Sequence, residues 1–372
     1  MPPLSMMIKP VSSACNLRCK YCFYCDVSNH RETACYGKME GTTLRALVRR
    51  AFIYADGSVS FAFQGGEPLL AGLGFYQEFL ALVKEYNTRS LPVSYALQTN
   101  ALTLDDEMAE LFHQNNFLLG VSLDGCRETH DALRIDADGH GSYERALEGI
   151  ALLRRHKVAF NILCVVTRQV AQQVDAVWKE LAPYGFVQFI PCIDGFDGEK
   201  SEFSINSEEY GQFLTRCFLL YEAAYRAGQP VSVRNFDNYL GLLLGQQPEL
   251  CGMSGRCGLY FLVESDGGVY PCDFYVLDEW RLGNVNDTSL ARMAKSEVSN
   301  RFRDLSLRLP ERCAACEWRA LCRGGCRRDR EPFVGDTPGE NRFCESYRTF
   351  FSQCGTTLTL LAKRIKEQNQ RG

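Results

Sequence analysis

The distribution of cysteine constrains this chain more than any other feature. The sequence holds 18 cysteines among 372 residues. A group of three opens the chain and nine lie in its last third, whereas the middle holds only scattered ones. Met1–Pro10 carries only Lys9 as a charge and has no cleavage-site pattern, so we expect no signal peptide and a cytoplasmic protein. Because the cytosol keeps thiols reduced, the cysteines predict metal or cluster ligation rather than disulfides.

Charge and composition exclude several kinds of partner. Lys and Arg number 41 against 45 Asp and Glu, which gives a formal net charge of −4. The chain therefore lacks the basic surplus that binds nucleic-acid phosphates. Apolar runs such as Asn161–Val166 are far shorter than the roughly 20 residues that a membrane span requires. We expect neither a nucleic-acid partner nor a membrane partner.

Short β-type runs alternate with longer amphipathic stretches through the first part of the chain. Six such units predict a parallel sheet with helical crossovers, either a barrel or a doubly wound layer. Polar or glycine-rich residues follow several of the strands, which is where a parallel barrel builds its active site. The predicted strands are Ser5–Val11, Val59–Gln64, Val93–Thr99, Phe117–Leu123, Phe160–Val166 and Val187–Pro191, and the predicted helices are Thr42–Ala55, Phe75–Asn87, Asp105–Asn115, Tyr143–His156, Val170–Ala182 and Ser207–Ala227.

After Pro230 the sequence becomes rich in cysteine, glycine and charged residues. Two β-type runs, Leu259–Glu264 and Gly268–Pro271, are joined by Ser265-Asp266-Gly267, and the Asp-Gly step favours a hairpin. This region has few long apolar runs to build a conventional core. We therefore expect metal ions or clusters to stabilise it.

Three cysteines follow the first predicted strand directly. Cys15, Cys19 and Cys22 are separated by three and two residues, so a tight loop can bring their thiolates to one face of a four-iron cluster. Three ligands leave one iron open to bind another molecule. A structural zinc site is the alternative, because it normally has four ligands and Cys25 is available as the fourth. The spacing favours the iron–sulfur cluster.

This loop resembles the CxxxCxxC signature of radical S-adenosylmethionine enzymes, with Tyr21 as the aromatic residue before the last cysteine. Gly65-Gly66-Glu67-Pro68 is similar to the family's GGEP phrase, whose backbone meets the methionine amino group. The resemblance implies a partial (β/α)6 TIM-type barrel and a 5′-deoxyadenosyl radical formed from S-adenosylmethionine. It also implies that Ser122 and Arg134 hold the ribose and carboxylate of this cofactor. Ile193 resembles the position that contacts its adenine.

The C-terminal cysteines resemble the SPASM extension, which carries two auxiliary four-iron clusters. A strictly local grouping would join the four cysteines between 313 and 326, and spacing alone does not decide the matter. Two zinc sites are the alternative metal assignment. The resemblance implies a crossed grouping, with Cys251, Cys257, Cys272 and Cys326 for the first cluster and Cys313, Cys316, Cys322 and Cys344 for the second.

These likenesses predict three parts of the chain. Residues 1–235 form the radical core domain, and residues 236–350 form the SPASM domain with a β-hairpin and short helices. Residues 351–372 form a C-terminal helix, where Cys354 is expected to be a helix-face thiol that binds no metal.

Along essentially its whole length the chain resembles the anaerobic sulfatase-maturating enzymes, most closely over Pro3–Pro10, Phe61–Pro68 and Tyr270–Asn284. These oxidoreductases convert a cysteine or serine of a sulfatase to Cα-formylglycine. The resemblance implies a sulfatase polypeptide substrate with a C/S-x-P-x-R-type motif and an external electron donor such as flavodoxin or ferredoxin. The alternative function is a SPASM-type peptide maturase that forms a thioether or carbon–carbon crosslink on a ribosomal peptide.

Asp273 is the catalytic residue that this resemblance implies. It follows Cys272 directly, so it would bring a proton-accepting carboxylate beside an electron-accepting cluster. Asp278 is the alternative carboxylate, although we expect it to pair with Arg281 or to cap a turn. The residues expected to line the peptide site are Tyr24 and Gln64, with Asn100, Asp124 and Arg327 as further candidates.

Overall fold

The computed structural model describes residues 3–198 and 200–371. The chain divides into two compact units, each built from several stretches of sequence. Unit 1 runs up to Leu123 and takes in His130–Asn161 and Leu259–Phe302. Unit 2 comprises Asp124–Thr129, Ile162–Gly258 and the chain from Arg303 onward.

The core of unit 1 is a sheet whose centre is parallel. Four parallel strands, β1 to β4, lie side by side in chain order. At the outer edge of β1 a later strand, β8, pairs parallel with it. Strands β9 and β10 then extend the sheet in antiparallel orientation. The predicted α/β class and the predicted hairpin are therefore confirmed. The strands are β1 (Leu4–Ile8), β2 (Val59–Phe63), β3 (Val93–Thr99), β4 (Phe117–Ser122), β8 (Phe261–Val263), β9 (Gly268–Tyr270) and β10 (Gly283–Asn284).

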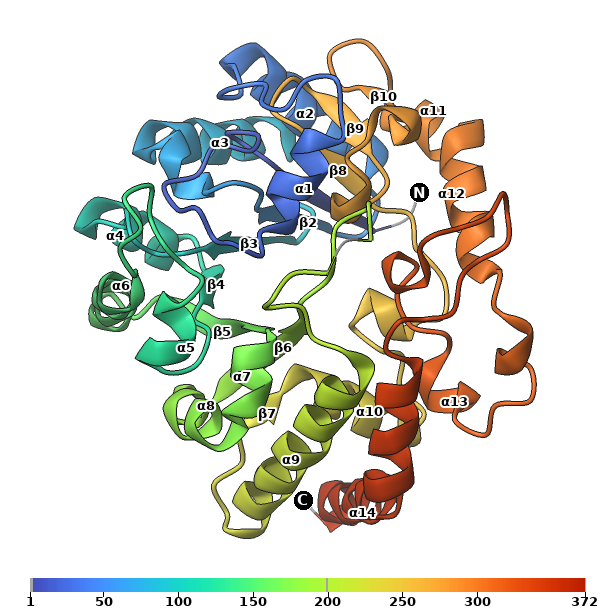
Figure 1. Ribbon diagram of the computed structural model, residues 1–372. Helices are drawn as coiled ribbons and strands as arrows, with labels where there is room; N and C mark the ends of the chain where they lie inside the picture. The colour runs from blue at the N-terminus through green and yellow to red at the C-terminus, as the bar shows by residue number, and fades with distance from the viewer. Residues whose placement is uncertain (1–2, 199, 372) are drawn as a thin grey trace. The chain divides into compact units, whose positions relative to one another are not determined.

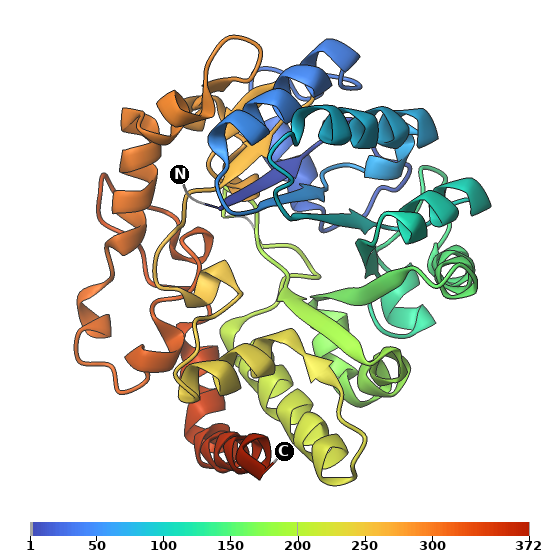
Figure 2. The same ribbon diagram turned by 180° about the vertical axis from the view of Figure 1, so that it is seen from behind.

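Helices cover the outer side of this sheet because alternate strand residues are apolar. In β2 the buried side chains are Val59, Phe61 and Phe63, and the rings of Phe63 and Phe79 lie 4.9 Å apart, edge to face. Helices α2 and α3 lie side by side over these strands (Figure 1, and from behind in Figure 2). The helices of unit 1 are α1 (Phe23–Asn29), α2 (Gly41–Tyr54), α3 (Leu73–Tyr86), α4 (Asp106–Gln114), α6 (Tyr143–Arg155) and α11 (Leu290–Ala294).

Unit 2 contains two further parallel strands, most of a third, and the longest described helices. Strands β5 (Ala159–Val166), β6 (Phe186–Pro191) and β7 (Ser232–Val233) pair in that order. Helix α9 (Ser207–Arg226) begins with a capping box, in which Asn206 accepts a hydrogen bond from the Glu209 amide and the Glu209 carboxylate accepts one from the Asn206 amide.

The last helix of the chain packs along α9. Helix α14 (Cys344–Arg371) lies against both α9 and α10 (Arg234–Leu243), as the lower part of Figure 1 shows. The aromatic rings of Phe218, Phe236 and Phe350 meet at this contact, at centroid distances of 5.2 to 5.7 Å. Two shorter helices precede α14 in the chain: α12 (Glu297–Leu307), which begins in the part of the chain assigned to unit 1, and α13 (Arg319–Cys322) in unit 2.

Two helices differ from the sequence-based expectation. The helix predicted over Val170–Ala182 is two helices, α7 (Arg168–Gln172) and α8 (Val174–Leu181). The chain bends at Gln173, whose φ of −116° and ψ of 31° lie outside the helical region. The C-terminal helix starts at Cys344 rather than at residue 351, because the apolar positions that pack on α9 begin earlier.

Candidate active site and metal centres

The first three cysteines lie on one loop between β1 and α1. Cys22 is the N-cap residue of α1, and its amide donates a hydrogen bond to the Cys19 carbonyl. Burial raises the pKa of Cys15 to about 12, and the neighbouring Cys19 and Cys22 thiols add to this shift. A hydrogen bond from Cys25 lowers the pKa of Cys22 to about 6. Cys15 is therefore close enough to Cys19 and Cys22 for their charges to affect its pKa.

Two predicted cofactor residues lie beside these thiols. The Arg134 guanidinium is 3.8 Å from the Cys19 sulfur and lies over the Tyr21 ring, 5.4 Å from its centre. Asn100 approaches from the end of β3, and its side-chain amide donates to Asn16 at 2.7 Å and lies 4.0 Å from the Cys15 sulfur. Cationic and amide donors thus surround the thiols, which suits a negatively charged cofactor carboxylate.

The Gly65-Gly66 pair lets the loop after β2 press against the cysteine loop. Gly66 has a φ of +26°, and a Cβ there would lie 2.0 Å from the Ala14 carbonyl oxygen. A Cβ at Gly65 would lie 2.4 Å from the Lys9 side chain. At Gly66 the Ala14 backbone leaves no room for a side chain, and at Gly65 the φ of +87° disfavours any residue other than glycine.

Glu67 shapes the same loop from within. Its carboxylate accepts hydrogen bonds from the Asn100 amide, the Thr99 hydroxyl and the Leu69 amide at 2.8 to 3.0 Å. Burial raises the pKa of Glu67 to about 7. Both oxygens accept hydrogen bonds from the protein, so Glu67 fixes the backbone of this loop.

The other two predicted cofactor residues stand at strand ends. Ser122 ends β4 in unit 1 and is half-buried. Ile193 lies in unit 2, two residues after β6, and is also half-buried.

The predicted base and both predicted peptide-site residues meet in unit 1. Gln64 donates a hydrogen bond from Nε2 to Asp273 Oδ2 at 2.9 Å and is also bonded to the Tyr24 hydroxyl. The Cys272 sulfur lies 3.4 Å from Asp273 Oδ1. Burial raises the pKa of Asp273, although the hydrogen bond from Cys272 acts to lower it. A carboxylate, an amide and a phenol therefore converge directly beside a predicted cluster ligand.

A buried ion network behind this group has no counterpart in the sequence-based prediction. Lys9 and Arg31 both donate to Glu264 Oε2, at 3.1 and 2.7 Å, and none of the three side chains is more than 1% exposed. The Lys9 ammonium also lies 5.1 Å from the centre of the Tyr24 ring. A charged residue at the end of the apolar run Leu4–Ile8 was the only sequence signal for it.

The remaining candidates have structural contacts. Asp278 accepts a hydrogen bond from the Glu32 amide at 2.8 Å, whereas Arg281 pairs with Asp266 at 2.7 Å, so the expected pairing of Asp278 with Arg281 is wrong. Asp124 accepts from the Val165 amide within unit 2. Arg327 is 3% exposed and lies over the Phe333 ring.

The C-terminal thiols fall into two groups within unit 2. Burial raises the pKa of Cys326, and the nearby Cys251 and Cys257 thiols raise it further. Gly252, which follows Cys251, also lies close to Cys326, since a Cβ there would be 3.5 Å from the Cys326 Cβ. Burial likewise raises the pKa of Cys322 to about 11, and its neighbours are Cys313, Cys316 and Cys344. The eighth predicted ligand, Cys272, lies in unit 1 after β9.

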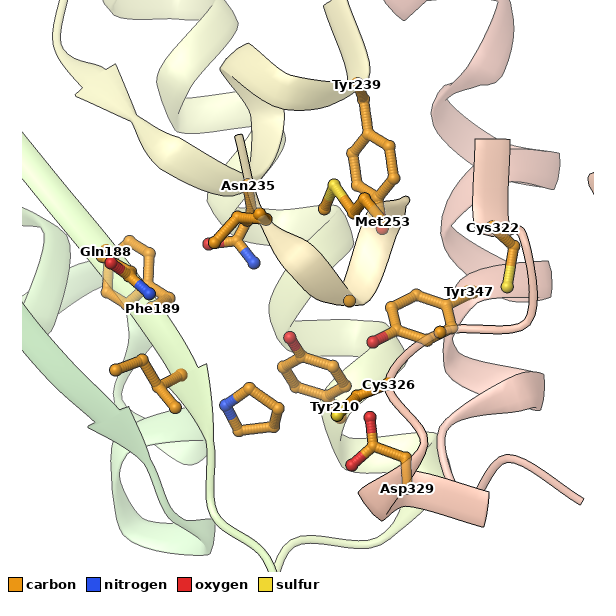
Figure 3. A pocket seen from close by; sticks show the side chains of 15 residues that line it. Gln188, Phe189, Tyr210, Asn235, Tyr239, Met253, Cys322, Cys326, Asp329 and Tyr347 are labelled. Carbon is orange, nitrogen blue, oxygen red and sulfur yellow. The ribbon is translucent and has the colours of Figure 1, made fainter. Parts of the chain in front are cut away.

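Unit 2 also contains a cavity of about 140 Å³ next to residues of both groups. Its lining includes one thiol of each, Cys322 and Cys326. Figure 3 shows the Tyr210 and Tyr347 rings turned toward the cavity, with Asp329 next to Cys326. Thiolates are the usual ligands of iron–sulfur clusters, so both groups fit such clusters by donor chemistry.

Comparison with known families agrees with this chemistry. Residues 10–177 match the radical SAM superfamily, and residues 254–317 match the SPASM model, described as an iron–sulfur cluster-binding domain. The chain is 44% identical to a cysteine-type anaerobic sulfatase-maturating enzyme of Clostridium novyi, over 98% of this chain and 99% of the relative. It is 30% identical to a serine-type enzyme of Bacteroides thetaiotaomicron, over 98% and 93%.

A solved structure shows the same fold. The chain superimposes on anSMEcpe with bound AdoMet and Cp18Cys peptide at a TM-score of 0.93 and 40% identity, covering 98% of this chain and 100% of that one. Streptococcus suis SuiB bound to its precursor peptide SuiA is similar in fold alone, with a TM-score of 0.64 and 15% identity over 93% and 76%. These matches confirm the predicted radical enzyme with S-adenosylmethionine and iron–sulfur cofactors, and they favour sulfatase maturation over peptide crosslinking. The chain belongs to the family of anaerobic sulfatase-maturating enzymes.

Proposed function

We propose that this enzyme oxidises a cysteine of a sulfatase to Cα-formylglycine, with Asp273 as the base. The observation that carries the proposal is the hydrogen bond from Gln64 to Asp273, which fixes a carboxylate beside Cys272 and Tyr24. Cysteine rather than serine is the proposed target because the cysteine-type relatives are 40 to 44% identical and the serine-type relatives 30 to 32%.

The first three cysteines are the proposed ligands of a [4Fe–4S] cluster that leaves one iron for S-adenosylmethionine. When bound, this cluster and S-adenosylmethionine together would supply the 5′-deoxyadenosyl radical, and the auxiliary clusters would accept an electron. Arg134 offers a cationic donor to the cofactor carboxylate, and Gly65-Gly66 opens the backbone to it. The full set of proposed cofactor-binding residues is Tyr21, Gly65, Gly66, Glu67, Ser122, Arg134 and Ile193.

Two auxiliary [4Fe–4S] clusters are proposed with crossed ligand sets. The neighbours of Cys326 and of Cys322 support the crossed grouping over the local one, because Cys326 adjoins Cys251 and Cys257 whereas Cys322 adjoins Cys344. Cys272 completes the first set. The proposed enzyme therefore holds three clusters.

The proposed reaction removes one hydrogen atom, one proton and one electron from the substrate CH2–SH group. Asp273 accepts the thiol proton, and Gln64 orients the carboxylate through its amide. Loss of the hydrogen atom from Cβ and of the electron leaves a thioaldehyde. Water replaces the sulfur, which gives the aldehyde and releases hydrogen sulfide.

The proposed partners follow from the same assignment. The substrate is a sulfatase segment with a Cys-x-Pro-x-Arg-type motif, and the electron donor is a flavodoxin or ferredoxin. No helix among the described residues is long and apolar enough to cross a membrane. We place the reaction in the cytoplasm, since a reducing compartment preserves the cysteine ligands.

An anaerobic assay with matched peptides tests the proposed function. One peptide carries Cys-x-Pro-x-Arg, a second carries serine at the target position, and a third carries alanine. Mass spectrometry should show formylglycine in the cysteine peptide together with 5′-deoxyadenosine, less product with serine and none with alanine. A crosslinked peptide that retains its sulfur would instead establish the peptide-maturase alternative.

A further inference from the structure

The loop that carries Ile193 is held by two arginines of its own unit. The Asp194 carbonyl accepts a hydrogen bond from Arg328 at 2.8 Å, and the Asp194 carboxylate pairs with Arg342 at 3.0 Å. The Arg328 guanidinium also lies 4.0 Å from the centre of the Phe196 ring. Three contacts therefore fix the backbone immediately after Ile193.

This attachment is shielded from water. The side chains of Arg342 and Asp194 are only 22% and 14% exposed, and Arg328 is 2% exposed as a whole. Shielded ion pairs and bonds to charged donors are stronger than exposed ones. By contrast, the side chains of the Arg216–Asp175 pair in the same unit are 49% and 60% exposed, so water weakens that pair.

Both arginines belong to segments that carry cysteine ligands of the proposed auxiliary clusters. Arg328 follows Cys326 by two residues, and Arg342 precedes Cys344 by two. The Arg342 amide donates to the Asp329 carbonyl at 2.9 Å, so the two segments are also bonded to each other. The loop after β6 is thus attached to one segment from each auxiliary ligand set.

We infer that Arg328 and Arg342 are positioning residues for the adenine-binding loop, and that they couple S-adenosylmethionine affinity to the integrity of the auxiliary clusters. The inference rests on the proposed function, in which Ile193 contacts adenine. Any shift of Asp194 moves Ile193 through the shared peptide bond. Binding at either site must then affect the other by the same factor.

The first test measures the dissociation constant of S-adenosylmethionine on the fully reconstituted enzyme under anaerobic conditions. Arg342→Gln and Asp194→Asn should each raise it by about 5-fold or more, the range expected of coupled sites. The double variant should be no worse than either single one, because both remove the same contact. Arg342→Lys should restore part of the affinity.

Iron content is measured on every variant so that loss of a cluster is not mistaken for loss of positioning. Asp194→Asn is decisive here, because Asp194 stands in no segment that carries a proposed cluster ligand, and the nearby Cys192 belongs to none of the proposed ligand sets. Arg312→Gln is the matched control, since Arg312 adjoins Cys313 but pairs with Glu340 and Glu345 rather than with the loop. This control should leave the dissociation constant unchanged.

The second test uses the reciprocal effect. S-Adenosylmethionine should slow the release of auxiliary iron to a chelator in the unmutated enzyme and lose this effect in Asp194→Asn. If Ile193→Ala weakens S-adenosylmethionine binding while Asp194→Asn and Arg342→Gln bind it normally, the arginines do not position the loop. If Ile193→Ala also binds normally, the proposed adenine contact itself is wrong, and the inference falls with it.

Discussion

Gln64 and Asp273 are separated by 209 residues, yet the Gln64 amide donates a 2.9 Å hydrogen bond to the Asp273 carboxylate. The sheet of unit 1 explains how they meet. Strand β1 pairs with β2, which Gln64 follows, and also with β8, whose hairpin partner β9 leads to Asp273. The chain thus returns after more than half its length to place a carboxylate beside helix α1, which follows the first cysteines.

Iron analysis tests the proposed metal content. One three-cysteine set and two four-cysteine sets predict on the order of twelve irons per chain after anaerobic reconstitution, with matching sulfide. Saturation near four irons, with zinc in the remaining sites, would contradict the assignment of the C-terminal ligands.

Single ligand variants should separate the two kinds of cluster. Cys19→Ala removes one of three proposed ligands, so cleavage of S-adenosylmethionine should disappear. Cys322→Ala leaves that loop intact, so 5′-deoxyadenosine should still form at saturating S-adenosylmethionine while formylglycine falls sharply. Chromatography of the nucleoside and mass spectrometry of the peptide measure both products. Undiminished formylglycine from Cys322→Ala would remove that cluster from the mechanism.

Glu264 should be a major determinant of stability. Burial acts to raise its pKa, but Lys9 and Arg31 outweigh that effect and hold the pKa of Glu264 below its ordinary value. Glu264→Gln leaves two buried cations without their counter-charge, so unfolding free energy should fall by about 3–5 kcal/mol.

The control for this variant is Glu85→Gln, which removes an exposed partner of Arg45 in the same unit. Exposed pairs contribute about 0–1 kcal/mol, so its urea midpoint should hardly move. Equal midpoints for the two variants would show that the buried network does not stabilise unit 1.

The regular part of the fold was predictable because its signals are local. All six predicted strands of the alternating region are present, and the Asp266-Gly267 turn produced the expected hairpin. The break at Gln173 was not predictable, since neither glycine nor proline marks it. The pairing of β1 with β8 was also hidden, because strand pairing across most of the chain leaves no local pattern.

The residues of the candidate site were predictable, whereas their contacts across the chain were not. Spacing and family resemblance indicated the cysteines, Arg134 and Asp273 one residue at a time. They gave no sign that Lys9 and Glu264, 255 residues apart, form a buried pair beside Tyr24. Nor did they indicate that Asp194 would bind two arginines, because such contacts depend on how distant segments pack.

The most direct test of the central claim is the ratio of formylglycine to 5′-deoxyadenosine in Asp273→Asn. This change keeps the shape and hydrogen-bonding capacity of the side chain but removes its basicity, so 5′-deoxyadenosine should form while formylglycine falls by about 10²–10⁴-fold. Asp278→Asn is the matched control, because Asp278 is exposed and its carboxylate accepts a hydrogen bond from the Glu32 amide, away from Gln64 and Cys272. This control should keep the unmutated ratio. Formylglycine at the unmutated rate from Asp273→Asn would contradict the role of Asp273 as the base.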